Sequence, residues 1–120
     1  MVKVLLRNEQ MFQERITERH VKAFLDIVIL AMLNGKPMYG YKIIAAIHRE
    51  FGVLLSPGSL YPLLHSLEES KLIESCFESG KIVYAATYQG RRKFQEVFTA
   101  YKMAMQAMEN FIKRHGENSP

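Results

Sequence analysis

The sequence predicts a mainly helical α+β domain with three short helices, a two-stranded β-hairpin and one long C-terminal helix. Three observations predict it. Apolar residues recur at helical spacing in four segments, two β-like runs are separated only by Ser79-Gly80, and Gly or Pro stands at most of the breaks. The chain has 120 residues, of which 48% are hydrophobic and 23% charged. Those values are typical of one folded domain and exclude global disorder.

The N-terminal part is expected to hold one buried helix after a less regular segment. Residues 8–20 are mostly polar, so we expect residues 1–20 to form an arm or a short helix. Across residues 21–33 apolar residues are too frequent for a one-sided helix, and this helix should be buried on more than one side. Asn34-Gly35 and the following Pro37 predict where it ends.

Two more helices follow. The first spans about residues 39–51 and ends at Gly52. The second begins at Ser56-Pro57-Gly58-Ser59 and continues to about residue 70. Its internal Pro62 fits the first turn if Gly58 or Ser59 is the N-cap. The predicted inner faces are Ile43, Ile44, Ile47 and Phe51 in the first helix, and Leu60, Leu63, Leu64 and Leu67 in the second.

A hairpin and a long helix complete the chain. The β-like runs at residues 72–78 and 81–87 are joined by Ser79-Gly80, a pair typical of a tight turn. Thr87 is placed to cap a helix whose apolar stripe continues for about five turns. Gly116 is expected to end this helix, which leaves residues 117–120 as a tail. The stripe consists of Phe94, Val97, Phe98, Tyr101, Met105, Met108, Phe111 and Ile112.

Three helices followed by a hairpin are the element order of a winged helix-turn-helix. In that fold the third helix enters the major groove of DNA, and the hairpin, or wing, lies along the backbone or minor groove. At about 100° per residue, the side of the third helix opposite its leucines carries small and hydrogen-bonding groups. That helix has no Arg or Lys before Lys71, so bidentate reading of guanine is not available to it. Selectivity would then rest on weaker contacts, water or DNA shape.

Three segments of the chain form recognisable motifs: Met-Tyr-Gly-Tyr-Lys-Ile-Ile at residues 38–44, Leu-Ser-Pro-Gly-Ser-Leu-Tyr-Pro-Leu-Leu-His-Ser-Leu-Glu at 55–68, and Tyr-Ala-Ala-Thr-Tyr-Gln-Gly-Arg at 84–91. These segments resemble the PadR family of transcriptional regulators. The resemblance is to the shorter class of the family, in which one helix follows the wing. It implies a homodimer that binds palindromic operators in double-stranded DNA, usually as a repressor, and is often released by a small molecule. We expect such an effector to bind at the dimer interface, and we expect no cofactor or metal.

The candidate DNA contacts lie on the second and third helices, the wing and the start of the last helix. Tyr39 and Tyr41 could each bind phosphate or pack beneath the third helix. His65 could reach a base edge or stay solvated, and Lys81 beside the wing turn could bind phosphate or serve solubility. Arg91 begins a basic run that could reach phosphates or form a solvated face. The complete set is Tyr39, Tyr41, Lys42, Ser56, Gly58, Ser59, Tyr61, Pro62, His65, Lys81 and Arg91.

The apolar stripe of the last helix predicts that the chain associates with a second copy of itself. Its apolar stripe extends roughly 30 Å at 1.5 Å per residue, which is more than a three-helix core covers. The helix at residues 21–33 also has an apolar surplus, and a symmetry mate would cover both. Methionines of the last helix could instead line an adaptable pocket. The predicted interface residues are Phe24, Val28, Phe98, Tyr101, Met105, Met108 and Ile112.

The chain is therefore divided into an N-terminal arm or short helix (1–20), a DNA-binding winged helix-turn-helix (21–88), a dimerisation helix (89–116) and a tail (117–120). No apolar run approaches the roughly 20 residues of a membrane span, and the start has no cleavage-like site of a signal peptide. The lone Cys76 forms no internal disulfide and is expected to be a plain strand residue rather than a redox switch. We expect a cytoplasmic protein.

Enzymes are excluded because the four histidines and Cys76 lack metal-ligand spacing, and no phosphate-binding loop or nucleophile elbow is present. The net charge is +4, and three of the four excess positive charges lie in residues 36–93. That distribution mildly favours a polyanionic partner. The alternative is a winged-helix module that binds only protein, which the weak charge of the third helix would suit.

Overall fold

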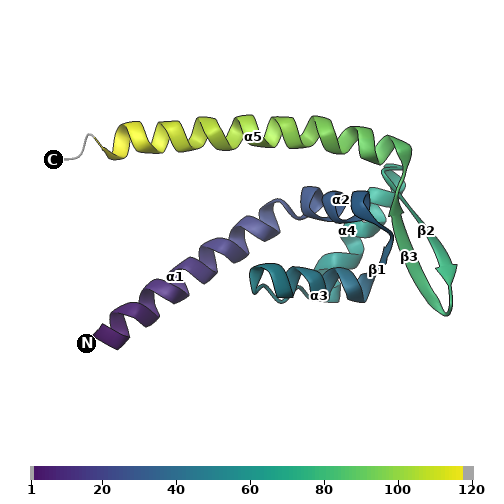
Figure 1. The fold of residues 1–120 in the computed structure, drawn as a ribbon, viewed down its shortest axis with the longest axis horizontal. Helices are drawn as coiled ribbons and strands as arrows, with labels where there is room; N and C mark the ends of the chain where they lie inside the picture. The colour runs from purple at the N-terminus through teal and green to yellow at the C-terminus, as the bar shows by residue number, and fades with distance from the viewer. Residues whose placement is uncertain (1, 118–120) are drawn as a thin grey trace.

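The computed structural model describes residues 2–117 and the side chains of residues 9–117. Within these residues the elements are α1 (Val2–Ala23), α2 (Leu25–Gly35), β1 (Met38–Tyr39), α3 (Gly40–Phe51), α4 (Pro57–Glu69), β2 (Ile73–Glu78), β3 (Lys81–Ala86) and α5 (Tyr88–Gly116). Figure 1 shows α2, α3 and α4 packed together beside the β2–β3 hairpin, while α1 and α5 extend from this body as two arms. The predicted mainly helical winged helix-turn-helix with one long C-terminal helix is confirmed.

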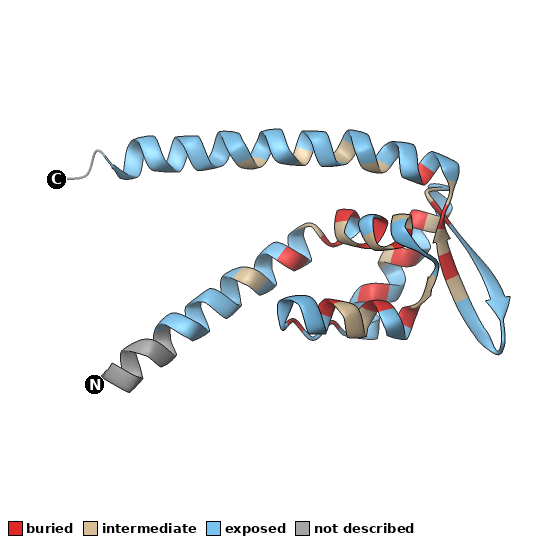
Figure 2. Cartoon of the chain, viewed as in Figure 1, coloured by how far each residue is buried: buried red, intermediate tan, exposed pale blue. Residues whose placement is uncertain are grey.

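The core lies between α2, α3, α4 and the base of the hairpin. Its largest fully buried side chains are each less than 2% exposed, and Figure 2 shows that burial is concentrated in this body while α5 and the described part of α1 are mostly exposed. Phe51, which was expected to face inward, is 41% exposed because it lies at the last turn of α3 and lines a surface groove. The fully buried set is Ile29, Ile43, Ile47, Leu55, Leu60, Leu64 and Ile73.

The N-terminal segment differs from the prediction. It is neither an arm nor a short helix, because α1 is helical from Val2 to Ala23 and includes Val21. The break between α1 and α2 falls at Phe24, where the backbone turns to φ −117° and ψ 28°. The ring of Phe24 meets Tyr101 of α5 edge-on, with centroids 4.5 Å apart. The helix therefore breaks at a position without Gly or Pro, where Phe24 contacts a residue distant in the sequence.

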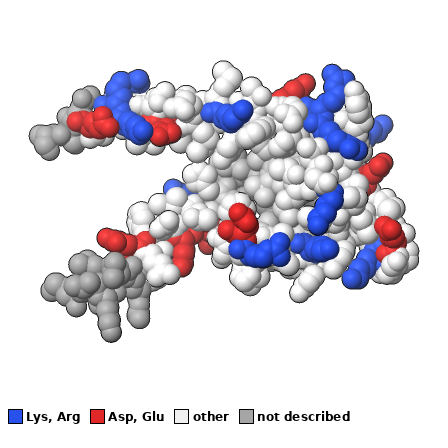
Figure 3. Space-filling model, in the orientation of Figure 1, with Lys and Arg blue, Asp and Glu red and all other residues white. Residues whose placement is uncertain are grey.

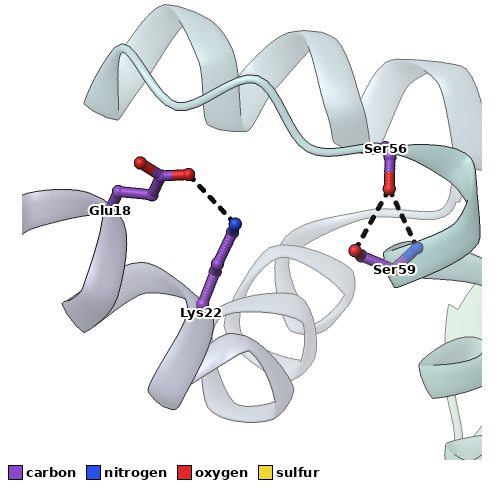
Figure 4. Close-up of polar contacts among 4 residues, drawn as sticks. All are labelled: Glu18, Lys22, Ser56 and Ser59. Carbon is purple, nitrogen blue, oxygen red and sulfur yellow. Dashed lines mark hydrogen bonds and ion pairs between the residues drawn. The ribbon is translucent and has the colours of Figure 1, made fainter. Parts of the chain in front are cut away.

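The N-cap of α4 is Ser56 rather than Gly58 or Ser59. The backbone N–H of Ser59 donates to Ser56 Oγ over 3.2 Å, and Ser56 Oγ donates to Ser59 Oγ over 3.1 Å (Figure 4). Pro57 then occupies the first helical position, where its missing N–H costs nothing. Pro62 lies in the second turn, so the carbonyl of Gly58 loses its usual helical donor. Both residues are exposed, which leaves that carbonyl open to water.

The sheet has three strands where a two-stranded wing was expected. Its order is β1-β3-β2, all antiparallel, with Tyr39 of β1 opposite Val83 of β3. With only two residues, β1 is too short to be predicted from a period of apolar residues. Its pairing with β3 connects the start of α3 to the wing. At the wing tip Ser79 and Gly80 have φ of 51° and 79°, as a type I′ hairpin turn requires.

The start of α5 is fastened to the turn between α4 and β2. Thr87 caps the helix as expected: the N–H of Gly90 donates to Thr87 Oγ1 over 2.9 Å, and that hydroxyl donates to the carbonyl of Lys71 over 2.7 Å. The carbonyl of Leu72 lies directly against Gly90, where any Cβ would collide with it. The predicted tail at 117–120 lies outside the described residues except for Glu117, the C-cap of α5. Among the helices that the structure describes, none is long and apolar enough to cross a membrane.

Candidate nucleic-acid interface

The outer face of α4 is accessible and its leucine face is buried. Gly58, Ser59, Pro62 and His65 are exposed, and Tyr61 is 43% exposed. The positive end of the helix dipole lies at the start of α4, where Pro57 has no N–H and the N–H of Ser59 donates to Ser56 Oγ. The N-terminal half of α4 therefore offers small polar groups and free space to an anionic partner.

Tyr61 connects α4 to the first residue of α3. Its ring and hydroxyl lie against Gly40, so that a Cβ at Gly40 would collide with both. Burial raises the pKa of Tyr84 above its ordinary value of 10.0, and the nearby Tyr61 and Glu68 raise it further. Tyr61 is thus held against α3 and beside β3 while part of its ring stays exposed. The sequence did not predict that Tyr61 packs against Gly40, because no spacing rule links residues 40 and 61.

Tyr39 brings together two of the candidate lysines. The ammonium of Lys81, on the wing, lies 4.2 Å from the centroid of the Tyr39 ring, and the ammonium of Lys42, on α3, lies 5.9 Å from it. The closer contact follows from the register, since Tyr39 is opposite Val83 and Lys81 is two residues away on the same face of β3. One aromatic ring therefore links the wing to α3.

The remaining candidates are distributed more widely. Tyr41 is exposed on α3, and Ser56 is occupied as the N-cap of α4. His65 Nε2 lies 3.1 Å from Glu69 Oε1, one turn along α4. Arg91 is exposed but belongs to the first turn of α5. Figure 3 shows Lys and Arg side chains over α3 and beside the wing, and a separate group over the start of α5.

The charge on α4 itself is acidic and confined to its last turn. Glu68 accepts a hydrogen bond from Ser75 of β2, and Glu69 faces His65. No Lys or Arg occurs between Pro57 and Glu69. Cationic contacts to an anion lying along α4 would have to come from the flanking elements, α3 and the wing.

A second candidate site is an apolar groove of about 480 Å³ between α1, α2 and α5. Phe24, Val28, Phe98 and Tyr101, four of the predicted interface residues, line it. Met105 is half-buried farther along α5, while Met108 and Ile112 are each 61% exposed beyond the groove. The sequence analysis did not include Ile16, His20 and Phe51, which also line the groove. The sequence signals were the apolar Ile16 in the segment expected to be an arm and the apolar spacing that placed Phe51 on the inner face of its helix; nothing pointed to His20.

The described residues contain no cluster of three or more His, Cys, Asp or Glu side chains able to hold a metal ion. Cys76 is exposed on β2. Its position on a strand agrees with the expectation from the sequence.

The α3–α4 pair and the β2–β3 wing define a winged helix-turn-helix protein of the class that binds DNA. Residues 29–96 match the transcriptional regulator PadR-like family. The chain belongs to this family, whose members are transcriptional regulators and not enzymes.

Solved structures of similar fold include a PadR-like transcriptional regulator from Bacillus cereus, with 24% identity and a TM-score of 0.71 over 79% of this chain and 97% of that one. A PadR family regulator from Eggerthella lenta has 21% identity and a TM-score of 0.71 over 93% and 96%. A PadR family regulator from hypervirulent Clostridium difficile has 28% identity and a TM-score of 0.65 over 74% and 98%.

A curated relative is an uncharacterized 37.1 kDa protein in a transposon of Streptomyces fradiae. It is 42% identical over 56 residues, which are 47% of this chain. The match spans only 16% of that much longer protein.

Proposed function

We propose that this regulator is a homodimeric repressor that binds a palindromic operator in double-stranded DNA, with α4 of each copy in the major groove. The observation that carries the proposal is the exposed N-terminal half of α4, flanked by Lys42 of α3 and Lys81 of the wing. In a dimer the two α4 helices would face half-sites about one helical turn, or ~34 Å, apart. A repressor of this kind acts on DNA in the cytoplasm.

The candidate residues take different roles in this proposal. Gly58, Ser59, Tyr61, Pro62 and His65 face the base edges from α4. Ser59 accepts a hydrogen bond from Ser56, so its own hydroxyl proton is left to donate to the DNA. Tyr41, Lys42, Lys81 and Arg91 contact the backbone, Tyr39 supports the two lysines, and Ser56 caps α4.

Sequence selectivity is expected to be modest and to depend on DNA shape. No Lys or Arg of α4 can form the bidentate contact to guanine that most often specifies a base. Hydroxyl groups and a histidine supply weaker, partly water-mediated contacts. Groove width and deformability therefore contribute a large share of the discrimination.

The dimer forms along α5 and the groove between α1, α2 and α5. The groove is lined almost entirely by apolar side chains, and the apolar stripe continues past it to Met108 and Ile112. A symmetry mate covers both by the same contact. A small apolar effector would bind within the groove at this interface and alter the dimer.

Fluorescence anisotropy with labelled duplexes tests DNA binding. We expect binding at about 50 mM salt that weakens as salt is raised. Tyr61→Ala should weaken binding by a factor that corresponds to roughly 1–3 kcal/mol, and it should lower the free energy of unfolding by less, because part of the ring is already exposed. If Tyr61→Ala melts far lower but binds normally when folded, Tyr61 is a core residue and its role here is wrong.

One observation favours a second candidate function, a module that binds only protein. α4 carries no cation and ends in two glutamates, which is unusual for a helix that lies among phosphates. Failure to bind any duplex or a heparin column at low salt would support this alternative. Repression itself is tested by transcription in vitro from a promoter that contains a selected operator.

A further inference from the structure

We infer that Tyr39 is a positioning residue whose ring holds Lys42 of α3 and Lys81 of the wing together as one clamp for a DNA phosphate. The inference rests on the proposed function, because it requires that the surface around α4 bind DNA. It assigns Tyr39 a role through its aromatic face, where the sequence suggested a phenol that binds phosphate or a ring packed beneath α4.

The first step is the orientation of Lys81. Its direct cross-strand partner is Glu78, which would be the ordinary partner for its charge. Among the described residues no ion pair joins these two side chains. The Lys81 ammonium lies instead over Tyr39, 4.2 Å from the ring centroid, well within the range of a cation–π contact. The wing lysine is therefore turned away from the acidic residue beside it and toward α3.

The second step is that two like charges share one ring. The Lys42 ammonium lies 5.9 Å from the same centroid, at the outer limit of such a contact. Two ammonium groups repel each other and would otherwise spread into solvent. Attraction to the ring offsets part of this repulsion, and an anion that contacts both ammonium groups would remove the rest. The arrangement fits a phosphate.

The third step is that the ring has a fixed position. Tyr39 is half-buried, its backbone pairs with Val83 in the sheet, and it is also the N-cap residue of α3. The backbone pairing does not depend on the side chain, so the ring can be replaced without removing β1. Because the ring is anchored at both the wing and α3, it sets the position of one lysine relative to the other.

Two substitutions distinguish the contribution of the aromatic face of Tyr39 from that of its hydroxyl group. Tyr39→Phe keeps the face and removes the hydroxyl, while Tyr39→Leu removes the face and keeps an apolar side chain. Tyr88→Leu is the matched control, since it removes an exposed ring at the start of α5 whose centroid lies 5.9 Å from the guanidinium of Arg92. Thermal unfolding shows whether each variant is folded.

The first measurement requires no DNA. A ring facing an ammonium shifts the NMR signals of the adjacent lysine ε-methylene protons upfield. We expect this shift for Lys81 in the parent and in Tyr39→Phe, and its loss in Tyr39→Leu. A Lys81 signal that does not respond to Tyr39→Leu would overturn the clamp.

The second measurement is binding to a labelled random-sequence duplex of about 30 base pairs, roughly three helical turns, over a range of salt. Tyr39→Leu should weaken binding about threefold to tenfold and leave the slope of affinity against salt unchanged, because both charges remain. Tyr39→Phe and Tyr88→Leu should bind like the parent. Lys81→Ala should instead make the slope shallower by about one unit per protomer.

The outcomes separate the clamp from the proposed function. If the parent binds DNA and Tyr39→Leu binds equally well, the clamp is wrong and the regulator role stands. If Tyr39→Phe is as weak as Tyr39→Leu, the phenol binds phosphate directly and the aromatic face has no role. In a Lys42→Ala/Lys81→Ala background Tyr39→Leu should add less than about a twofold effect. A parent that binds no duplex contradicts the proposed function, and the clamp together with it.

Discussion

Tyr61 keeps its place because the residue beneath it has no side chain. Gly40 is buried at the start of α3, and the hydroxyl and ring of Tyr61 fill the space that a Cβ would need. The same tyrosine is close enough to Tyr84 to raise the pKa of that residue. A residue proposed to contact DNA is therefore also part of the packing between α3, α4 and the wing.

Gly40→Ala should displace the Tyr61 ring and lower the free energy of unfolding by about 1–3 kcal/mol, the usual cost of overpacking. Urea denaturation measures this. Gly35→Ala is the control, because nothing lies within 4 Å of its added Cβ and its stability should change by less than about 0.5 kcal/mol. The double variant Gly40→Ala/Tyr61→Ala should lose less than the sum of the two single variants. Strictly additive losses would show that the two residues are not coupled.

The raised pKa of Tyr84 predicts that the folded chain loses stability at alkaline pH. Its pKa is higher in the folded chain than the ordinary 10.0, because burial disfavours the phenolate. Its contribution to stability is complete below the ordinary value and is lost as pH rises through the folded pKa. The free energy of unfolding should decline above about pH 10, and Tyr84→Phe should remove part of this decline. The control is Tyr41→Phe, at an exposed position, which should leave the decline unchanged. An identical decline in the parent and in Tyr84→Phe would exclude Tyr84 as the group responsible.

The elements that were predictable from the sequence are those fixed by nearby residues. α3 and α4 followed from apolar spacing, the wing turn from Ser79-Gly80, and the start of α5 from Thr87. The ends of α3, α4 and α5 were accurate to a few residues for the same reason. Of the candidate site, the exposed face of α4 was predictable because helical geometry alone separates it from the leucines.

The elements that were missed depend on residues distant in the chain. The break at Phe24 accompanies a contact with Tyr101, and β1 exists only through pairing with β3. Gly90 was part of a recognised motif, but the sequence gives no sign that it lies against Leu72. The meeting of Lys81 with Tyr39 likewise depends on strand register, which local patterns do not determine.

Gly90→Ala should be among the most damaging substitutions in α5. The atom that a new Cβ would meet is the carbonyl oxygen of Leu72, which belongs to the backbone and cannot rotate away. Thr87 holds the same turn, because its hydroxyl donates to the carbonyl of Lys71 and its backbone N–H to that of Leu72. We expect a loss of about 3 kcal/mol or more, measured by urea or thermal unfolding. Gly116→Ala, with open space around its Cβ, is the control within the same helix; equal stability of the two variants would contradict the close contact at Gly90.

At the scale of the whole molecule, the two arms leave a large apolar surface without a partner in the chain. α1 and α5 diverge from the body (Figure 1), and most of α5 is exposed (Figure 2). Phe98, Met108 and Phe111 are all exposed on a single helix. A surface of this kind is typical of an association site.

Light scattering at micromolar concentration should therefore report a dimer. Phe98→Glu places a charge in the apolar groove and should shift the protein toward the monomer, with a parallel loss of DNA affinity because two α4 helices no longer act together. Met103→Glu is the control, since Met103 is exposed and lies off the apolar stripe. A folded monomer of the parent chain, or a Phe98→Glu variant that remains dimeric, would place the interface elsewhere.

The close fit of Gly90 against Leu72 has a mechanical consequence for a dimer. α5 is 29 residues long and most of it extends beyond this joint, so in a dimer it would act as a stiff lever that pivots beside α4 and the wing. Because Gly90 packs directly against Leu72, a small rotation between the α5 helices of two copies would move both α4 helices by a corresponding distance. The pitch of DNA is fixed, and only one separation of the α4 helices matches it. In the proposed dimer, a molecule bound in the groove beside α5 would therefore change DNA affinity without contacting α4.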